Sequence, residues 1–469
     1  MKPIQSLKTA VCVAVLTALA GALPAWAGCT DELTKDTDTK TSAKGKGRDA
    51  ALANPVPASA ASPMEPLTQL QQIALEATRR SASVGAARLL AEAAELEITE
   101  TKAGRWPTVS VSASAGAARS EIDGRVVSSG KQGTVNLNVA GNLWDNGRLS
   151  NLTDWRTQLA GSARFGAALT NEQVVLEAVS AALERNRYRL QAQVYQQYMR
   201  KMSCLVEALE TIVSEDRGRM SELVQARKTQ AQAELQRDQA LAQSRQSELR
   251  LRKLVGEQAP PGDGITIPLA NVPELGEINR QIEMSNDARQ LRAQAEAQDA
   301  YAKAVVAGQK PQLNWAVGKS EGRIAGTNTS GWTAGVTVSY SIFNGFSDDA
   351  ASRAAAKRAE AARQQLQDLL NTKFSRTAEI YDTAISAFDR AKRYVDVLRD
   401  SERVRNFTFQ QWSQLGRRSL FDVMSAEGDH FNLRIAYVNA LHDGYLATAQ
   451  LRSLGSGLTA WLTPQLVNP

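Results

Sequence analysis

Residues 332–342 of this chain, WTAGVTVSYSI, alternate strictly between apolar side chains and small or polar ones. Strict alternation over about ten residues predicts a β-strand with one apolar face and one polar face. Most of the remaining sequence is rich in Ala, Gln, Arg and Glu, a composition that favours helix. The fold must therefore accommodate a few strongly two-faced strands among long helices.

Three other segments have a similar alternating pattern. The predicted strands are 107–117 (PTVSVSASAGA), 134–143 (TVNLNVAGNL), 310–318 (KPQLNWAVG) and 332–343, and glycine-containing loops are predicted between the two members of each pair. A length of about ten residues is that of a strand that crosses a lipid bilayer.

The predicted elements occur twice in the same order. A helix at 66–102 precedes the first strand pair, and a helical region follows it to about residue 256, with a weak break near Gly218. A helix at 278–306 precedes the second pair, and helices at 347–407 and 420–454 follow it. This order predicts an internal duplication.

The same junction marks both halves, because LWDNGR (143–148) and SIFNGF (341–346) each follow a strand pair. The PPGDG sequence at 260–264 indicates a linker. The predicted organisation is a signal peptide at 1–27, a disordered leader at 28–65, repeats at 66–259 and 277–458, a linker at 260–276 and a C-terminal tail at 459–469.

The long helices have heptad spacing. Apolar or small residues lie four and three apart from Leu370 to Leu398, and again from Leu433 to Leu454. Such spacing predicts left-handed coiled-coil packing, and abundant Ala permits close helix approach. A helix of about 60 residues would be roughly 90 Å long, which excludes a compact globular domain.

The N-terminus predicts export. Basic residues precede an apolar run that ends in Ala-Trp-Ala at 25–27, the pattern of a cleaved secretory signal, so Gly28 is the expected first mature residue. Lipidation of Cys29 is not expected, because Trp26 stands where a lipoprotein signal favours Leu. A Cys29–Cys204 disulfide and two unpaired thiols both remain open, with unpaired thiols favoured. The leader has almost no large apolar residue and is expected to be disordered.

After the signal no stretch reaches the roughly 18 apolar residues of a membrane-spanning helix, so strands would have to span the membrane and close into a barrel. Four strands are too few, and either a dimer with eight or a trimer with twelve would be needed. Small polar residues on the inner face favour the open lumen of a trimer. A soluble β-layer packed on helices is the alternative. Interfacial aromatics are predicted at Trp144, Trp315, Trp332 and Tyr340.

The sequence offers little for catalysis. The two histidines, His430 and His442, are not part of an HExxH motif, so no metal site is expected. No phosphate-binding loop or nucleophile elbow is present, so neither an enzyme nor a cofactor is expected. The net charge of +6 is spread over helices that carry both signs, which does not indicate nucleic-acid binding.

Four motifs carry a family resemblance over residues 66–462. RWPTVSVSASAG (105–116), LWDNGR, SIFNGF and LGRRSLFDVMSAE (415–427) resemble, in order, the signature segments of the TolC family of outer-membrane channels, and GRMSELVQAR (218–227) is a weaker counterpart of the last. The resemblance implies a mainly α chain with four strands, assembled as a homotrimer with a 12-stranded transmembrane β-barrel and a 12-helix periplasmic tunnel. It places the protein in the outer membrane of a Gram-negative cell, in contact with outer-membrane lipid.

The resemblance also implies roles at the helix turns. Asp422 would belong to an acidic ring at the periplasmic entrance, and Arg418 would help to hold the closed state. Glu427 and Glu222 are further candidate gate residues, and Ser425 departs from the pattern where a second Asp would stand. Docking of partners is expected at Gly416, Arg417, Gly218 and Arg219. The alternative is an ordinary surface i,i+4 pair of about 0.3–0.5 kcal/mol.

The function implied is a passive exit duct that works with a periplasmic adaptor protein and either an inner-membrane ABC transporter or a proton-driven pump. LGRRSLFDV and the closing LRSLGSGLTAWL (451–462) are more similar to channels paired with ABC transporters, which favours type I protein secretion over tripartite drug efflux. A periplasmic adaptor and a structural coiled-coil envelope protein are less favoured alternatives.

Overall fold

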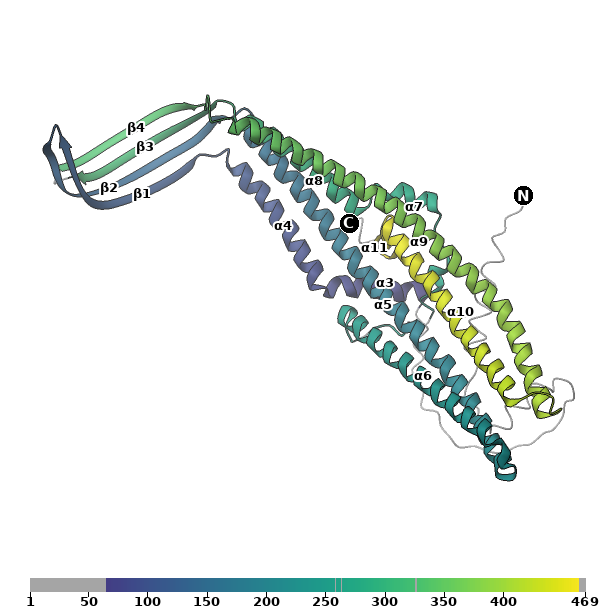
Figure 1. The fold of residues 1–469 in the computed structure, drawn as a ribbon. Helices are drawn as coiled ribbons and strands as arrows, with labels where there is room; N and C mark the ends of the chain where they lie inside the picture. The colour runs from purple at the N-terminus through teal and green to yellow at the C-terminus, as the bar shows by residue number, and fades with distance from the viewer. Residues whose placement is uncertain (1–64, 258, 263, 325–326, 464–469) are drawn as a thin grey trace, which may run out of the picture.

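The structure is a computed structural model that describes residues 65–257, 259–262, 264–324 and 327–463. The predicted signal peptide, Gly28 and Cys29 lie outside the described residues, as does most of the predicted leader. Cys204 is disulfide-bonded, so the favoured expectation of two unpaired thiols is wrong. The described chain is an elongated bundle of helices with a sheet extending from one end (Figure 1). Two helix–helix turns lie at the opposite end.

Two helices give the bundle its length. Helix α5 (Arg148–Glu215) has 68 residues and α9 (Ser347–Ser413) has 67. At 1.5 Å per residue each is roughly 100 Å long. Helix α6 (Met220–Val255) packs along α5 after the 3-10 turn η1 (Arg217–Arg219), and α10 (Leu420–Leu454) packs along α9.

These elements confirm the predicted long helices. The predicted break near Gly218 is the turn η1, and α10 has the bounds expected from the sequence. Helix α9 continues to Ser413, beyond the predicted end at residue 407. Among the described helices, none is both long and apolar enough to cross a bilayer.

Two predicted helices are each divided. The segment expected as one helix at 66–102 forms α3 (Pro66–Arg80) and α4 (Ala82–Ala103). The segment expected at 278–306 forms α7 (Leu275–Ile282) and α8 (Asn286–Gly308). Two short elements outside these segments are η2 (Ile267–Ala270) and α11 (Leu458–Leu462).

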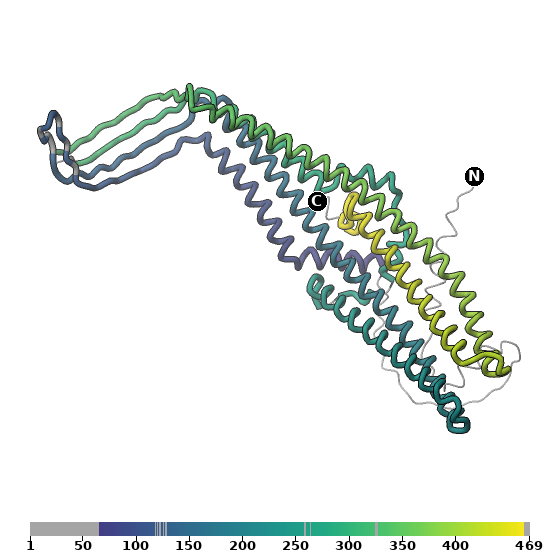
Figure 2. Tube along the Cα trace, viewed as in Figure 1, coloured from purple at the N-terminus to yellow at the C-terminus, as the bar shows by residue number. Residues whose placement is uncertain are grey.

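The first division occurs at Ser81, whose backbone is extended with ψ 115° and whose Oγ accepts a hydrogen bond from Val84 N–H at 3.4 Å. Figure 2 shows α3 lying across the long helices instead of continuing along α4. This orientation buries Leu70 and Ile73 completely in a core shared with α5 and α10. The residues on both sides of Ser81 favour helix, so the local sequence does not indicate the break, which the tertiary packing imposes.

The second division is held by a buried ion pair from α9. Lys373 Nζ donates to Asp287 Oδ1 at 2.6 Å and to Ser285 Oγ at 3.0 Å. The Lys373 hydrogen bond helps to hold the pKa of Asp287 below its usual value, against the opposing effect of burial. The start of α8 is thereby fixed to the middle of α9.

The four strands form one antiparallel sheet in the order β1-β2-β3-β4. They are β1 (Thr108–Ile122), β2 (Arg125–Trp144), β3 (Gln312–Ile324) and β4 (Thr327–Ser339). Much of the predicted loop between β1 and β2 is therefore strand, and the turn is confined to Asp123 and Gly124, both with positive φ. Residues in this stretch pair across the hairpin although they lack a hydrophobic pattern.

The register places one apolar and one polar surface across the whole sheet. Val109, Val139, Val317 and Ala334 lie opposite one another in a row, and so do Ser110, Asn138, Gly318 and Thr333. The predicted alternation is thus confirmed. The fourth strand ends at Ser339, so Tyr340, Ile342 and Phe343, predicted within it, lie beyond it.

Small residues allow the helices to pack closely. In α9 the seam residues Thr377, Ala384 and Ala391 are buried. A Cβ at Gly444 of α10 would lie 2.8 Å from two ring carbons of Phe388 of α9. The heptad seams predicted from the sequence are therefore the packed faces of the α9–α10 pair.

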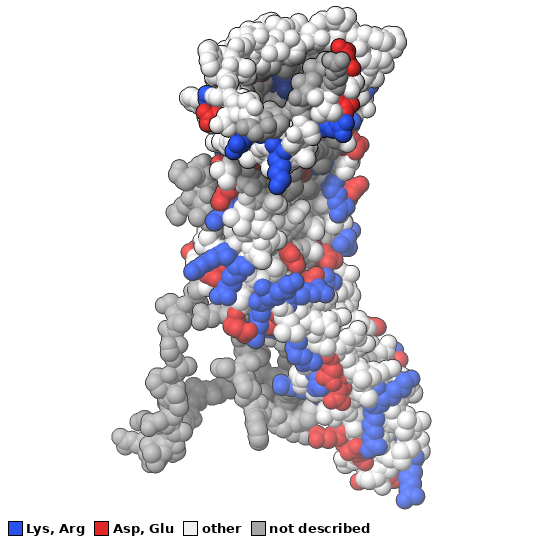
Figure 3. Space-filling view, turned by 90° about the vertical axis from the view of Figure 1, so that its left-hand side faces the viewer, with Lys and Arg blue, Asp and Glu red and all other residues white. Residues whose placement is uncertain are grey.

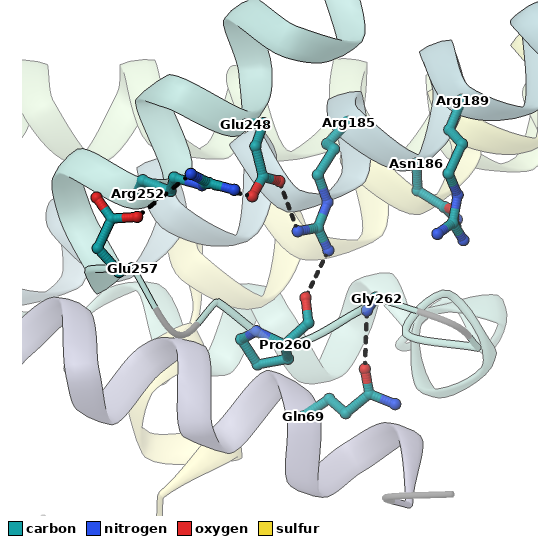
Figure 4. A network of polar contacts seen from close by, with 9 residues as sticks. All are labelled: Gln69, Arg185, Asn186, Arg189, Glu248, Arg252, Glu257, Pro260 and Gly262. Carbon is teal, nitrogen blue, oxygen red and sulfur yellow. Dashed lines mark hydrogen bonds and ion pairs between the residues drawn. The ribbon is translucent and has the colours of Figure 1, made fainter. Parts of the chain in front are cut away.

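The segment after α6 is anchored by a polar network (Figure 4). Arg185 of α5 donates to Glu248 Oε2 and to the carbonyl oxygen of Pro260, both at 2.8 Å, and Gly262 N–H donates to Gln69 Oε1 of α3 at 3.1 Å. Gly262 has φ +85°, and a Cβ there would contact Arg185. Glycine is therefore needed at this position.

Candidate functional site

The α5–α6 and α9–α10 turns lie together at the end of the bundle away from the sheet. Leu420 and Met424 of α10 share a buried cluster with Leu209 of α5 and Leu223 of α6, and Trp412 packs against that cluster. Residues about 200 positions apart in sequence thus form one unit, which we call the tip.

The first turn of the tip is built on Asp216. Its Oδ1 accepts a hydrogen bond from Gly218 N–H at 2.9 Å, which fixes the 3-10 turn. Arg219 pairs with Glu222 at 2.9 Å, three residues later. Glu222, a candidate gate residue, is therefore neutralised locally by Arg219, a candidate docking residue.

The second turn depends on Gly416. Its φ of +58° lies in the left-handed region, which favours glycine and permits a tight turn between the two helices. Arg417 N–H then donates to Gln411 O at 3.1 Å, and the Arg417 side chain is exposed.

Asp422 forms a capping box with Ser419 at the start of α10. Ser419 N–H donates to Asp422 Oδ2 at 3.0 Å, and Asp422 N–H donates to Ser419 Oγ at 3.2 Å. These hydrogen bonds from Ser419, more than the nearby charge of Arg418, lower the pKa of Asp422. Asp422 thus has a structural role in starting the helix that the sequence reading did not assign.

Arg418 does not hold Asp422. Its Nε donates instead to Gln411 Oε1 at 3.2 Å, and no ion pair joins it to Asp422 in the described part of the chain. The i,i+4 pair, which is the alternative to a gate role, is therefore absent among the described residues, because the capping box turns the Asp422 carboxylate toward Ser419. The gate role of Arg418 stays a prediction.

Glu427 does not fit an aqueous entrance. It is only 8% exposed, and its nearest cation is Arg405 of α9 at 3.8 Å. Burial raises its pKa, and the neighbouring Tyr198 of α5 has a pKa raised to about 12, chiefly by burial. A position five residues after Asp422 is about 140° farther around the helix, so it faces the interior when Asp422 faces out. Ser425 is exposed, on the side of Asp422.

The sequence reading missed the contacts that join the two hairpins above the tip. Arg187 of α5 donates to Asn439 Oδ1 at 2.9 Å and to Asp443 Oδ1 at 3.1 Å, both on α10. Gln191 donates to the same Asn439 oxygen at 2.5 Å. No local pattern indicates these pairs, because about 250 residues separate the partners.

The predicted aromatics lie on or next to the strands. Trp332 is 74% exposed, and Trp144 and Tyr340 are also exposed. Trp315 is half-buried because its ring crosses Gly141, where a Cβ would lie 2.7 Å from Nε1. The sequence reading did not select three further exposed aromatics at the helix end of the sheet, namely Trp106, Phe343 and Phe346.

The polar face of the sheet carries Ser, Thr, Asn, Gln, Gly and Ala. No Asp, Glu, Lys or Arg is present among its described side chains. Ser114 and Thr134 bond to each other through their hydroxyl oxygens at 2.7 Å. Figure 3 shows few charged residues at the sheet end and both signs along the helices. This face can contact water without favouring ions of either sign.

Comparison with known proteins identifies the fold. A scan against protein-family models finds no match, and none of the curated proteins matches by sequence. The solved structure of CusC matches with TM-score 0.75 at 16% identity, over 83% of this chain and 92% of that one. The outer-membrane channel OprN matches with TM-score 0.72 at 17% identity, over 89% and 99%. VceC, an outer membrane protein from Vibrio cholerae, matches with TM-score 0.71 at 18% identity, over 83% and 97%.

The fold of this chain is that of the TolC family of outer-membrane channels. The resemblance inferred from the strand and turn motifs is thereby confirmed at the level of fold.

Proposed function

We propose that the protein is a passive exit duct in the outer membrane of a Gram-negative cell, assembled from three chains. The observation that carries this proposal is the sheet, which has an apolar face, a neutral polar face and two edge strands, β1 and β4. Edge strands expose unpaired backbone groups, which a bilayer does not tolerate. Pairing β4 of one chain with β1 of the next satisfies those groups.

Three copies suit the polar face better than two. Eight strands leave an interior that side chains must fill, whereas twelve leave an open lumen. The inner face is lined by small residues such as Ser112, Gly318 and Thr333, which cannot fill a core. The resulting twelve-stranded barrel would continue into a tunnel of twelve helices.

Exposed apolar residues on the helices support this assembly. Leu89, Leu90 and Leu96 of α4 and Leu235 and Leu249 of α6 are all more than half exposed in the single chain. Surfaces of this kind indicate protein contacts. In a ring of three chains these faces pack against neighbouring copies.

The helices would extend into the periplasm, with the tip away from the membrane. The turns at Gly218 and Gly416, with Arg219 and Arg417, are the proposed docking points for a periplasmic adaptor and an inner-membrane transporter, which would supply the energy. We assign the duct to type I protein secretion, with a polypeptide as cargo, because of the LGRRSLFDV motif. Tripartite efflux of small molecules is the alternative.

Deleting the gene distinguishes type I protein secretion from efflux of small molecules. For a secretion duct we expect a large polypeptide to disappear from the medium with little change in drug tolerance, and the full-length chain on a plasmid should restore it. Hypersensitivity to small toxic compounds with normal protein export would favour efflux. Purified full-length protein that forms no pores in planar bilayers would contradict the channel itself.

The proposed gate is testable with variants that keep the helix start intact. Asp422→Asn preserves the hydrogen bond from Ser419 N–H and removes the charge, so block by multivalent cations is expected to weaken severalfold. Ser425→Asp adds a second acidic ring and should strengthen the block. The buried Glu427→Gln serves as the control. Single-channel recordings in which all three variants match wild type would place the gate elsewhere.

A further inference from the structure

The charged residues of the sheet lie on one side only. Six described side chains of the strands are charged, and all six belong to the apolar face. On β1 and β3 the first residue beyond the apolar run of this face is a cation, Arg119 and Lys319 respectively, and on β2 Lys131 follows one step after Gly133. The other three are Arg323, Glu121 and Glu321.

General exposure to water does not account for this distribution. The polar face at the same level carries Gly116, Gln132, Ser320 and Gly322 and no charged residue among its described side chains. If solvent alone determined the composition of this end of the sheet, both faces would carry charge. The environment of the apolar face must therefore differ from plain water just beyond the apolar run.

The register arranges three cations along a diagonal. Lys131 of β2 lies opposite Ala117 of β1, which is two residues before Arg119 on the same face. Arg323 of β3 lies opposite Gly133 of β2, which is two residues after Lys131. The cations thus shift by two residues from strand to strand. Strands in a barrel are tilted by about 35–45°, and such a tilt converts a diagonal of this kind into a belt at nearly one level.

The apolar run extends further toward the hairpin turn on β1 than on β3 and β4, which gives the slope its direction. On β1 the run ends at Ala117, whereas on β4 it ends at Trp332, which is opposite Lys319 and, through β2, level with Val111. Arg119, Lys131 and Arg323 therefore lie beyond the apolar band, whereas Lys319 lies at its edge on β3, between Leu137 of β2 and Trp332 of β4.

The belt has excess positive charge. Arg119 pairs with Glu121 at 2.6 Å, and Lys319 lies 3.6 Å from Glu321 and donates to Ser330 Oγ at 2.7 Å. Among the described side chains of the strands, four cations and two carboxylates give a formal net charge of +2 per chain. Close cations on neighbouring strands repel one another, so a bound anion would stabilise them.

We propose that Arg119, Lys131, Lys319 and Arg323 form a headgroup-binding belt that contacts the phosphate groups of anionic lipids at the border of the membrane. The proposal rests on the membrane-spanning role proposed above. The belt contacts lipid and not a solute in the lumen, because its four cations all lie on the apolar face of the sheet and none lies on the polar face. Exposed Trp332, directly opposite Lys319, lies at the same border, where interfacial aromatics are favoured.

Lipid counting by native mass spectrometry tests the proposal. Purified full-length protein in neutral detergent is titrated with phosphatidylglycerol or, separately, phosphatidylcholine. We expect wild type to retain phosphatidylglycerol preferentially, and Lys131→Gln to bind it about five-fold more weakly. The belt variant (R119Q, K131Q, K319Q and R323Q) should show no preference. A charge-matched control (R353Q, R376Q, R390Q and R403Q), with all changes on exposed α9 positions, should bind like wild type.

The outcomes separate the sources of binding. Equal retention by the belt variant and wild type overturns the proposal, as does an equal loss in the α9 control. Competition by millimolar inorganic phosphate would make the belt a general anion site and also overturn it. If the belt variant does not assemble, the single variants K131Q and R323Q are tested instead, and equal phosphatidylglycerol retention by both and by wild type overturns the proposal. Wild-type pores that conduct without lipid preference would refute this inference and leave the proposed function intact.

Discussion

Val336→Lys is expected to reduce the amount of assembled protein in the outer membrane at least ten-fold. Val336 is exposed on the apolar face, near the middle of the apolar run of β4. A lysine at the bilayer midplane costs about 2–4 kcal/mol, and a trimer would incur that cost three times. Blots of outer-membrane fractions, with unheated samples to preserve oligomers, measure the effect.

Thr337→Lys is the matched control, one residue further on the same strand. Thr337 lies on the polar face opposite Asn314, where a lysine would meet water. We expect assembly within about two-fold of wild type and a pore that favours anions. Equal losses for both variants would show that the two faces do not differ in their surroundings, and the proposed membrane role of the sheet would be wrong.

Acid is expected to destabilise the helical bundle through His442. This side chain is 4% exposed, and burial lowers its pKa from 6.5 to about 4, with Arg187 adding to the effect. The contacts with Val438 O and Asp443 oppose the shift without reversing it. Because the folded state disfavours the protonated ring, the stability is fully present above pH 6.5 and is lost as pH falls toward 4. The loss should reach roughly 3 kcal/mol, since each pKa unit is worth about 1.4 kcal/mol.

His442→Gln removes the group that takes up a proton in acid, and the Gln side-chain amide can still donate a hydrogen bond to Val438 O. Its denaturation midpoint in guanidinium should therefore fall less than that of wild type between pH 7 and pH 4, as followed by circular dichroism. His430→Gln is the comparison at the other histidine, whose pKa is also lowered to about 4 by burial and by Arg405 and Arg434. A His442→Gln profile parallel to wild type would contradict the prediction for His442. If the His430→Gln profile is parallel as well, the acid response comes from carboxylates instead.

Sequence periodicity identified the elements whose partners are adjacent or regularly spaced. Alternation along 332–338 separates the two faces of β4 because successive side chains of a strand point to opposite sides. Heptad spacing in 370–398 identifies the packed side of α9 for the analogous reason. The capping pair Ser419 and Asp422 was also within reach, since the residues are three apart at a helix start.

Only the tertiary structure decided features that depend on contacts between distant segments. The helix break at Ser81 exists because α3 buries Leu70 against other helices, and a local helix pattern carries no sign of that choice. The burial of Glu427 beside Arg405, and the links from Arg187 to Asn439 and Asp443, likewise join different helices. The sequence by itself determined which face each strand and helix presents, because that depends on a repeat of two or 3.5 residues. Which faces meet depends on packing across hundreds of residues, so only the folded chain could decide it.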